Sequence, residues 1–146
     1  MSFVLFYYIL TSFFFSQPSL DQPIFSLTKT ACYGTCPQYQ LRLFDNGLII
    51  YEGKMFVEKT GCFQFHISIS QLNELLKLIN EVNYFELDSL YDANVSDVQS
   101  IITEFKYKNQ EKKIIDRFKG PKDLEKIYKL IDHYVESNDN WLKCNN

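Results

Sequence analysis

The chain of 146 residues carries a formal charge of −3, and 46% of its residues are hydrophobic against 23% charged. This length and apolar content suit one globular domain with a core of its own. Lysine and glutamate residues are scattered along the chain, and the lysines form no basic cluster. This argues against a nucleic-acid partner. The few glycines and prolines and the lack of an internal repeat exclude a disordered or repeat protein.

The first feature in chain order is a charge-free apolar run at 3–15. It is shorter than the roughly twenty residues of a membrane span but has the length of the apolar part of a secretory signal peptide. Two observations do not fit: no Lys or Arg precedes Lys29, and cleavage after residue 16 would leave Phe14 at the third position before the cut. We expect a signal peptide at 1–16 and a linker at 17–23. An uncleaved anchor and a buried first strand are the alternatives.

From residue 24 the apolar residues predict a series of strands. The segment 39–43 alternates apolar with polar residues, as a half-buried strand does. Asp45–Gly47 supplies residues that adopt positive φ in a tight hairpin turn, and Asn109–Gln110 predicts a second hairpin. The clearest alternation is at 63–69, where Phe63, Phe65, Ile67 and Ile69 share one face. The strands expected are 24–28, 39–43, 48–52, 55–59, 63–69, 101–107 and 112–118.

Two amphipathic helices are predicted. Ser70 is the expected N-cap of the first helix, because its hydroxyl can accept a hydrogen bond from a first-turn amide, and Asn83 ends it. Pro121 is expected at the first position of the second helix, with Asp123 in its first turn. The buried stripes are Leu72, Leu75, Leu76, Ile79 and Val82, then Leu124, Ile127, Tyr128, Ile131, Tyr134 and Val135, with Phe85, Leu87 and Leu90 as core contacts from a loop.

The order strands, helix, hairpin, helix predicts an α+β fold, an antiparallel β-sheet of hairpins with two helices packed on one face. The sequence has no βαβ rhythm and no glycine loop for phosphate. We expect a single domain at 24–141 and a polar tail at 142–146.

The stretch TACYGTCPQYQLRLFDNGLIIYEG, residues 30–53, resembles the hallmark of an uncharacterised bacterial family, domain-of-unknown-function family 6438. That hallmark is Ala-Cys-aromatic-Gly-x-Cys-Pro, then a strand, an Asp/Asn-Gly turn and Tyr-Glu-Gly. The resemblance continues through 95–105 and 118–132 and covers 24–141. It implies an exported or envelope-associated protein and supplies no activity. The family usually has Asn-Gly in the late hairpin, where this chain has Asn109–Gln110.

Cys32 and Cys36 admit a redox, a metal and a structural interpretation. A reactive thiolate is usually activated by a helix N-terminus, a nearby cation or a Cys-x-x-Cys turn. Here the spacing is Cys-x-x-x-Cys, a strand follows, and Pro37 favours an extended Cys36. A zinc site would add Cys62 and His66, but these lie roughly 13 Å apart along one strand. His66 and the second histidine, His133, are therefore expected at the surface.

A structural disulfide is the interpretation that requires the fewest additional features of the sequence. Export favours oxidation of cysteines close in sequence, and Gly34 eases the closure of a short loop. We therefore expect a Cys32–Cys36 disulfide. Cys62 and Cys144 lie outside the hallmark, and we expect both to be free thiols.

The remaining candidates concern binding. Asp97 and Asp116 could meet near the hairpin ends, with a turn cap or a surface ion pair as the alternative for each. The other binding candidates are the loop residues Tyr33, Gly34, Thr35 and Pro37. No catalytic residue, metal or cofactor is expected.

The sequence thus predicts a monomeric, exported, non-catalytic domain that has a binding or structural role with another envelope component, a protein or a glycan. The expected location is the periplasm, the envelope or outside the cell, with no integral membrane domain after signal cleavage. The alternative is a thiol–disulfide redox or thiol-sensing protein that uses the same pair, Cys32 and Cys36.

Removal of residues 1–16 should leave a soluble, folded domain, because the segment contains no charged group and no part of the hallmark. Gel filtration and far-UV circular dichroism of a chain that starts at Gln17 test this. Persistent aggregation of the shortened chain would show that the apolar run is a core strand.

Overall fold

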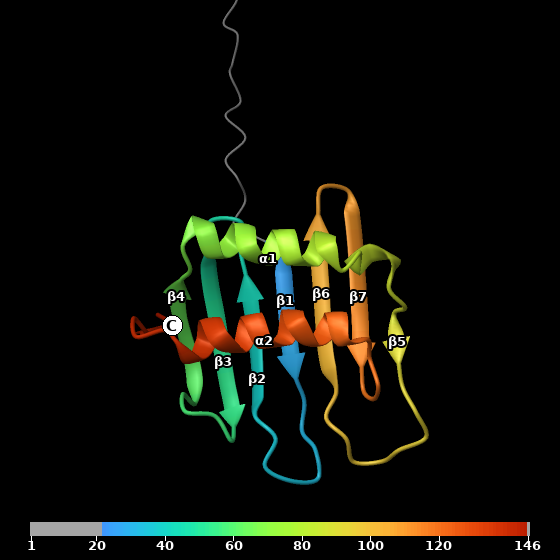
Figure 1. Cartoon of the computed structure of the whole chain (residues 1–146). Helices are drawn as coiled ribbons and strands as arrows, with labels where there is room; N and C mark the ends of the chain where they lie inside the picture. Colours follow the sequence, from blue (N-terminus) through green and yellow to red (C-terminus); the bar gives the residue numbers. More distant parts are fainter. Residues whose placement is uncertain (1–21, 146) are drawn as a thin grey trace, which may run out of the picture.

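The structure, a computed structural model, describes residues 22–145 and contains one eight-stranded sheet (Figure 1). The sheet order is β5-β7-β6-β1-β2-β3-β4-β8, and all neighbours are antiparallel except β5 and β7. The predicted α+β class is confirmed. The strands are β1 (Phe25–Lys29), β2 (Gln38–Leu43), β3 (Leu48–Met55), β4 (Gly61–His66), β5 (Leu90–Tyr91), β6 (Ile101–Tyr107), β7 (Gln110–Asp116) and β8 (Leu142–Lys143).

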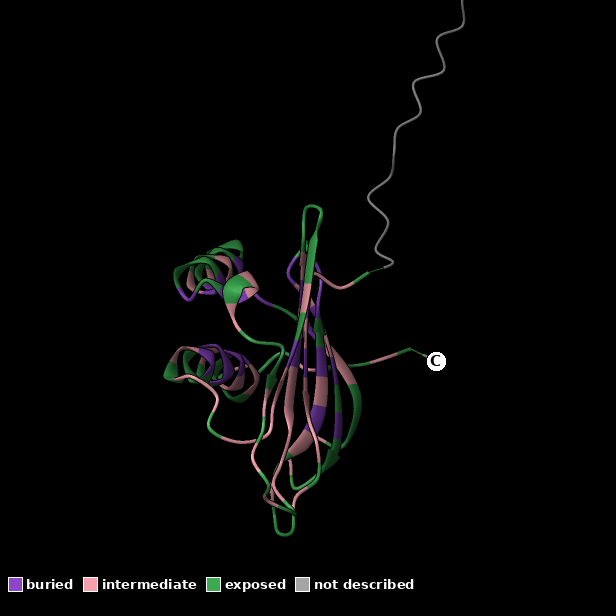
Figure 2. Ribbon diagram, turned by 90° about the vertical axis from the view of Figure 1, so that its right-hand side faces the viewer, coloured by how far each residue is buried: buried purple, intermediate pink, exposed green. Residues whose placement is uncertain are grey.

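Two helices, α1 (Ile69–Glu81) and α2 (Lys122–Glu136), cross the strands on the same side of the sheet (Figure 1). Figure 2 shows this side-on, with buried residues between the helices and the sheet. A short 3₁₀ helix, η1 (Tyr84–Glu86), follows α1. No helix within 22–145 is long and apolar enough to cross a membrane. The expected signal peptide at 1–16 and most of the expected linker lie outside the described residues.

The central strands bury one face completely. Leu27 on β1 and its register partner Leu41 on β2 have no exposed surface, whereas Arg42 on the other face is exposed. The turn from β2 to β3 is the predicted Asp45–Gly47. Gly47 has a φ of 81°, and a side chain there would meet the carbonyl oxygen of Ile67 at 2.7 Å.

Helix α1 begins two residues earlier than predicted. Ser68, and not Ser70, is the N-cap: its hydroxyl accepts from the Gln71 amide, and the Gln71 side chain accepts from the Ser68 amide. Because β4 ends at His66, Ile69 is the first helical residue and is 63% exposed. Its expected place on the buried strand face is therefore wrong. The helix ends next to Asn83, which has a φ of 50°.

Two predicted strand boundaries are wrong. No strand spans 55–59, because β3 continues through Gly53 to Met55 and the following residues form the connection to β4. Gly53 permits this, since a side chain there would collide with the Lys59 carbonyl folded back over the strand. The late hairpin turns at Lys108–Asn109, one residue before Asn109–Gln110, so that Tyr107 pairs with Gln110.

Smaller differences concern the ends of elements. Strand β7 stops at Asp116, short of the predicted Phe118, and Pro121 is the N-cap of α2, one position before its expected place. Leu90, expected in the core, is 56% exposed on β5. The expected polar tail contains β8, which pairs with β4.

Ile131→Asp should unfold the protein. Ile131 has no exposed surface on α2, so the variant would bury an unpaired carboxylate, at a cost comparable with a stability of about 5–15 kcal/mol. Leu76, predicted in the same way on α1, is only partly buried, so Leu76→Asp should remain folded with a lower midpoint. Urea unfolding followed by circular dichroism measures both. A wild-type midpoint for Ile131→Asp would contradict the facing of α2.

Candidate functional site

The connection from β1 to β2 is a loop closed by a disulfide between Cys32 and Cys36. This pairing confirms the expected one. The neighbouring loop braces it: the Tyr33 amide donates to the Asp97 carbonyl at 3.0 Å, and the Gln99 side chain donates to the carbonyls of Thr30 and Pro37, each at 2.8 Å. The loop backbone is thus held by a covalent bond and by hydrogen bonds to a second segment.

The Tyr33 side chain projects from this loop with 91% of its surface exposed. Gly34 and Thr35 beside it are exposed as well. Because the backbone at Tyr33 is already held in place, a partner that covers the ring would order little additional backbone, and the entropy cost of binding would be small. This is a favourable property for a contact residue.

A second disulfide joins Cys62 to Cys144, so the expectation of two free thiols is wrong. The cause is strand β8. It pairs antiparallel with β4, which places Cys144 opposite Cys62, and the Cys144 amide donates to the Cys62 carbonyl at 3.2 Å. The one sequence signal that the chain packs just before this tail was Trp141, because a large apolar ring is seldom left in solvent. With Cys32 bonded to Cys36 and Cys62 to Cys144, the hypothetical zinc site loses three of its four ligands.

The two candidate aspartates make different contacts. Asp97 contributes its backbone carbonyl to the disulfide loop. The Asp116 carboxylate accepts from the Gly120 amide at 3.1 Å and from the Tyr128 hydroxyl at 3.2 Å, so it caps the turn before α2. For Asp116, the structure therefore shows the turn cap that the sequence suggested as an alternative. Within 22–145 no three His, Cys, Asp or Glu side chains converge as a metal site would require.

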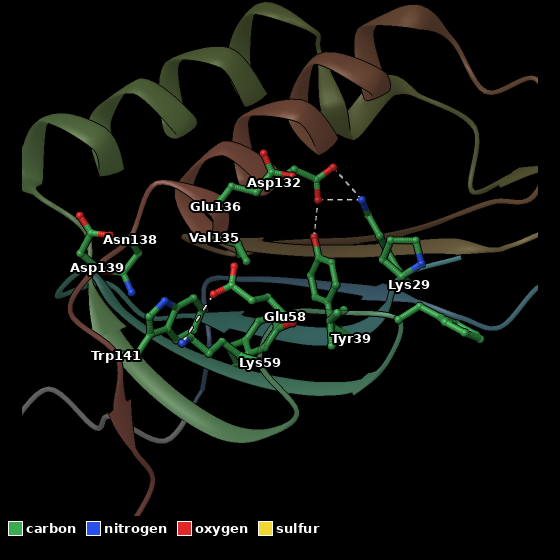
Figure 3. Close-up of a pocket in the computed structure, with 14 residues that line it drawn as sticks. Lys29, Tyr39, Glu58, Lys59, Asp132, Val135, Glu136, Asn138, Asp139 and Trp141 are labelled. Carbon is green, nitrogen blue, oxygen red and sulfur yellow. Dashed lines mark hydrogen bonds and ion pairs between the residues drawn. The ribbon is translucent and has the colours of Figure 1, made fainter. Parts of the chain in front are cut away.

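A cavity of about 460 Å³ lies between the second half of α2 and the sheet (Figure 3). Its walls are the ends of β1 to β3, the connection after β3 and the segment that follows α2. Pro37 of the disulfide loop also lines it. The aromatic lining is Tyr39, Tyr51, Phe56 and Trp141, and the charged lining is Lys29, Glu58, Lys59, Asp132, Glu136 and Asp139.

An ion pair and a hydrogen bond form one end of the cavity. The Lys29 ammonium lies 2.7 Å from both carboxylate oxygens of Asp132, and the Tyr39 hydroxyl donates to the same carboxylate at 2.6 Å (Figure 3). Burial, together with the negative charge of Asp132, raises the pKa of Tyr39 far above its ordinary value. Sequence reasoning missed this group, because Asp132 lies 103 residues from Lys29 along the chain.

A cluster of tilted and edge-on aromatic rings forms the floor. The ring of Tyr51 lies 5.2 Å from that of Tyr39 and 5.2 Å from that of Trp141, and Trp141 packs edge-on against Phe65 at 4.7 Å. Burial, and secondly the charge of Glu58, raises the pKa of Tyr51 to about 12. Trp141 lies at the far end of the cavity from Lys29 (Figure 3).

The rim holds polar groups with incomplete partners. Within the described chain, neither Glu136 nor Asp139 takes part in an ion pair. The side-chain nitrogen of Asn138 is buried and has no hydrogen-bond partner among residues 22–145, a situation that costs about 1–3 kcal/mol. Lys59 lies 3.7 Å from Glu58. The cavity therefore presents both donors and acceptors above an aromatic floor.

Residues 23–135 match a protein family described as a domain of unknown function, DUF6438. The match extends from the start of the described chain to the end of α2, so it includes the disulfide loop and most of the cavity wall. No curated protein matches the chain.

The two disulfides should differ in their effect on stability. Loop-closure entropy gives about 2 kcal/mol for the four-residue separation of Cys32 and Cys36, and between about 4 and 5 kcal/mol for the 82-residue separation of Cys62 and Cys144. The double serine variant of each pair should therefore keep its secondary structure, with the larger fall in midpoint for Cys62→Ser/Cys144→Ser. Thermal unfolding followed by circular dichroism measures this.

Peptide mapping without reductant should recover both linked fragments from the parent protein. An equal midpoint for the two double variants, or a rapidly alkylated thiol in the parent, would contradict the assignment.

Proposed function

Since the chain belongs to the DUF6438 family, whose description assigns no activity, we propose from the structure that it is an exported, non-catalytic domain. In this proposal it binds another component of the cell envelope through the loop closed by Cys32 and Cys36. The observation that carries the proposal is Tyr33, a ring 91% exposed on a backbone that a disulfide and a second loop hold in place.

Export is supported by cysteine oxidation. All four cysteines of the chain are paired in two disulfides, a state that persists in oxidising compartments and is rare in the cytosol. The apolar run at 3–15 is consistent with a route to such a compartment.

Binding through the loop is supported by its shape and stiffness. Exposed tyrosines are common anchors of protein interfaces, because one ring buries a large area and its hydroxyl still finds a hydrogen-bond partner. The brace from Asp97 and Gln99 reduces the ordering that a partner would have to impose. These properties favour a protein as the partner of the loop.

The redox alternative has less support. A reactive Cys32 or Cys36 would need a neighbouring cation or helix N-terminus, and β2 follows the loop. The nearest lysine in sequence, Lys29, directs its ammonium to Asp132. A reduction potential below about −300 mV would agree with a structural bond, and a much higher one would favour the alternative.

Site-specific photo-crosslinking tests the proposed surface. A photoreactive phenylalanine analogue at Tyr33 should link the exported protein to one partner in intact envelopes, whereas the same analogue at Tyr107, 44% exposed on the other hairpin, should not. Tyr33→Ala should reduce co-purification of that partner, and Tyr107→Ala should leave it unchanged. Equal linking at both positions would refute docking through the loop.

A further inference from the structure

We propose that the cavity beneath α2 is a binding site for a saccharide, specifically a neutral or N-acetylated hexopyranose unit. The inference concerns a cavity that shares only Pro37 with the Tyr33 loop, and it does not depend on what that loop binds. It rests on the volume, the aromatic floor and the distribution of hydrogen-bonding groups around the rim.

The volume and the floor suit a sugar ring. About 460 Å³ lies within the range of roughly 300–1,000 Å³ found for small-molecule sites. One face of a pyranose ring presents C–H groups, which carry a weak positive charge and pack favourably on the negative face of an aromatic ring. The half-buried Trp141 and the 49% exposed Phe56 supply the accessible rings of the cavity, with the buried Tyr51 packed against Trp141 beneath them.

The rim matches hydroxyl groups, each of which both donates and accepts. The carboxylates of Glu136 and Asp139 have no ion-pair partner within the described chain and can accept from hydroxyls. The Asn138 side-chain nitrogen is a buried donor without an acceptor, and a ligand oxygen at the cavity wall would supply one. Lys59, on the connection after β3, adds a second donor to the lining.

Charged ligands fit this arrangement less well. Aromatic rings with carboxylates also attract organic cations, but an ammonium group carries no acceptor for the Asn138 donor. An anion would meet the carboxylates of Glu136 and Asp139. A neutral ligand that carries both donors and acceptors avoids both conflicts.

The two disulfides hold opposite ends of this cavity. The bond from Cys32 to Cys36 lies between Lys29, the last residue of β1, and Tyr39 on β2. The bond from Cys62 to Cys144 holds the segment that carries Trp141 against β4. The walls are therefore fixed before a ligand enters, which reduces the cost of binding.

Intrinsic fluorescence gives a direct test, because Trp141 is the only tryptophan of the chain. The oxidised protein is titrated with glucose, galactose, mannose, N-acetylglucosamine, cellobiose, maltose and N,N′-diacetylchitobiose, and separately with choline and spermidine. At least one saccharide should change the tryptophan emission in a saturable manner, and calorimetry should give the same affinity.

Variants connect the signal to the cavity. Glu136→Gln and Asn138→Asp should each weaken saccharide binding by about tenfold, whereas Glu125→Gln, on α2 but paired with Lys129 outside the cavity, should not. Each variant is checked for a wild-type circular dichroism spectrum, and Asn138→Ser serves as a second substitution if Asn138→Asp does not fold. Saturation by choline or spermidine alone, no response to any saccharide, or equal affinity in all variants would overturn the proposal.

Discussion

Apolar contact between the central strands and α2 is the interaction on which the rest of the structure depends. Leu27, Leu41 and Ile131 all lack exposed surface, and they lie where the sheet and the helix face each other. At the end of β1 the apolar contact is replaced by polar groups. There the ion pair between Lys29 and Asp132 and the hydrogen bond from Tyr39 to Asp132 join α2 to the sheet. The cavity begins there, because charged side chains cannot pack as closely as aliphatic ones and keep access to water.

Local patterns were sufficient to predict most of the fold. Period-two alternation identified β2, β4 and β6, and a helical stripe identified α2 with buried residues such as Ile127. The predicted ends of helices and strands were wrong where a neighbouring residue could have the same structural role. Ser68 and Ser70 can both cap a helix, and the reciprocal bond with Gln71 decides in favour of Ser68. The strands predicted at 48–52 and 55–59 left Gly53 between them, but Gly53 lies inside β3, where another backbone segment packs against it.

Long-range contacts were beyond the reach of local patterns. Strand β8 is two residues long, and nothing in its own composition indicates pairing with β4. The bond from Cys62 to Cys144 follows from that pairing, so it could not be predicted either. The Cys32–Cys36 pair could be predicted, because its short loop and the adjoining strand are both local features. The cavity unites residues from four parts of the chain and has no sequence motif of its own.

The length of the edge strands has a consequence for association between copies. The edge strands of the described sheet, β5 and β8, are each two residues long: β8 covers the middle of β4, whereas β5 pairs with only Ile115 and Asp116 of β7 and leaves the outer edge of 110–114 without a partner strand. At one edge this protection is itself held by a covalent bond, Cys62–Cys144. In a reducing environment β8 would be retained only by its few backbone and aromatic contacts, and its departure would uncover the six-residue strand β4. The oxidation state of one cysteine pair thus controls how much unpaired strand edge the molecule presents to its neighbours, and with it the tendency to aggregate.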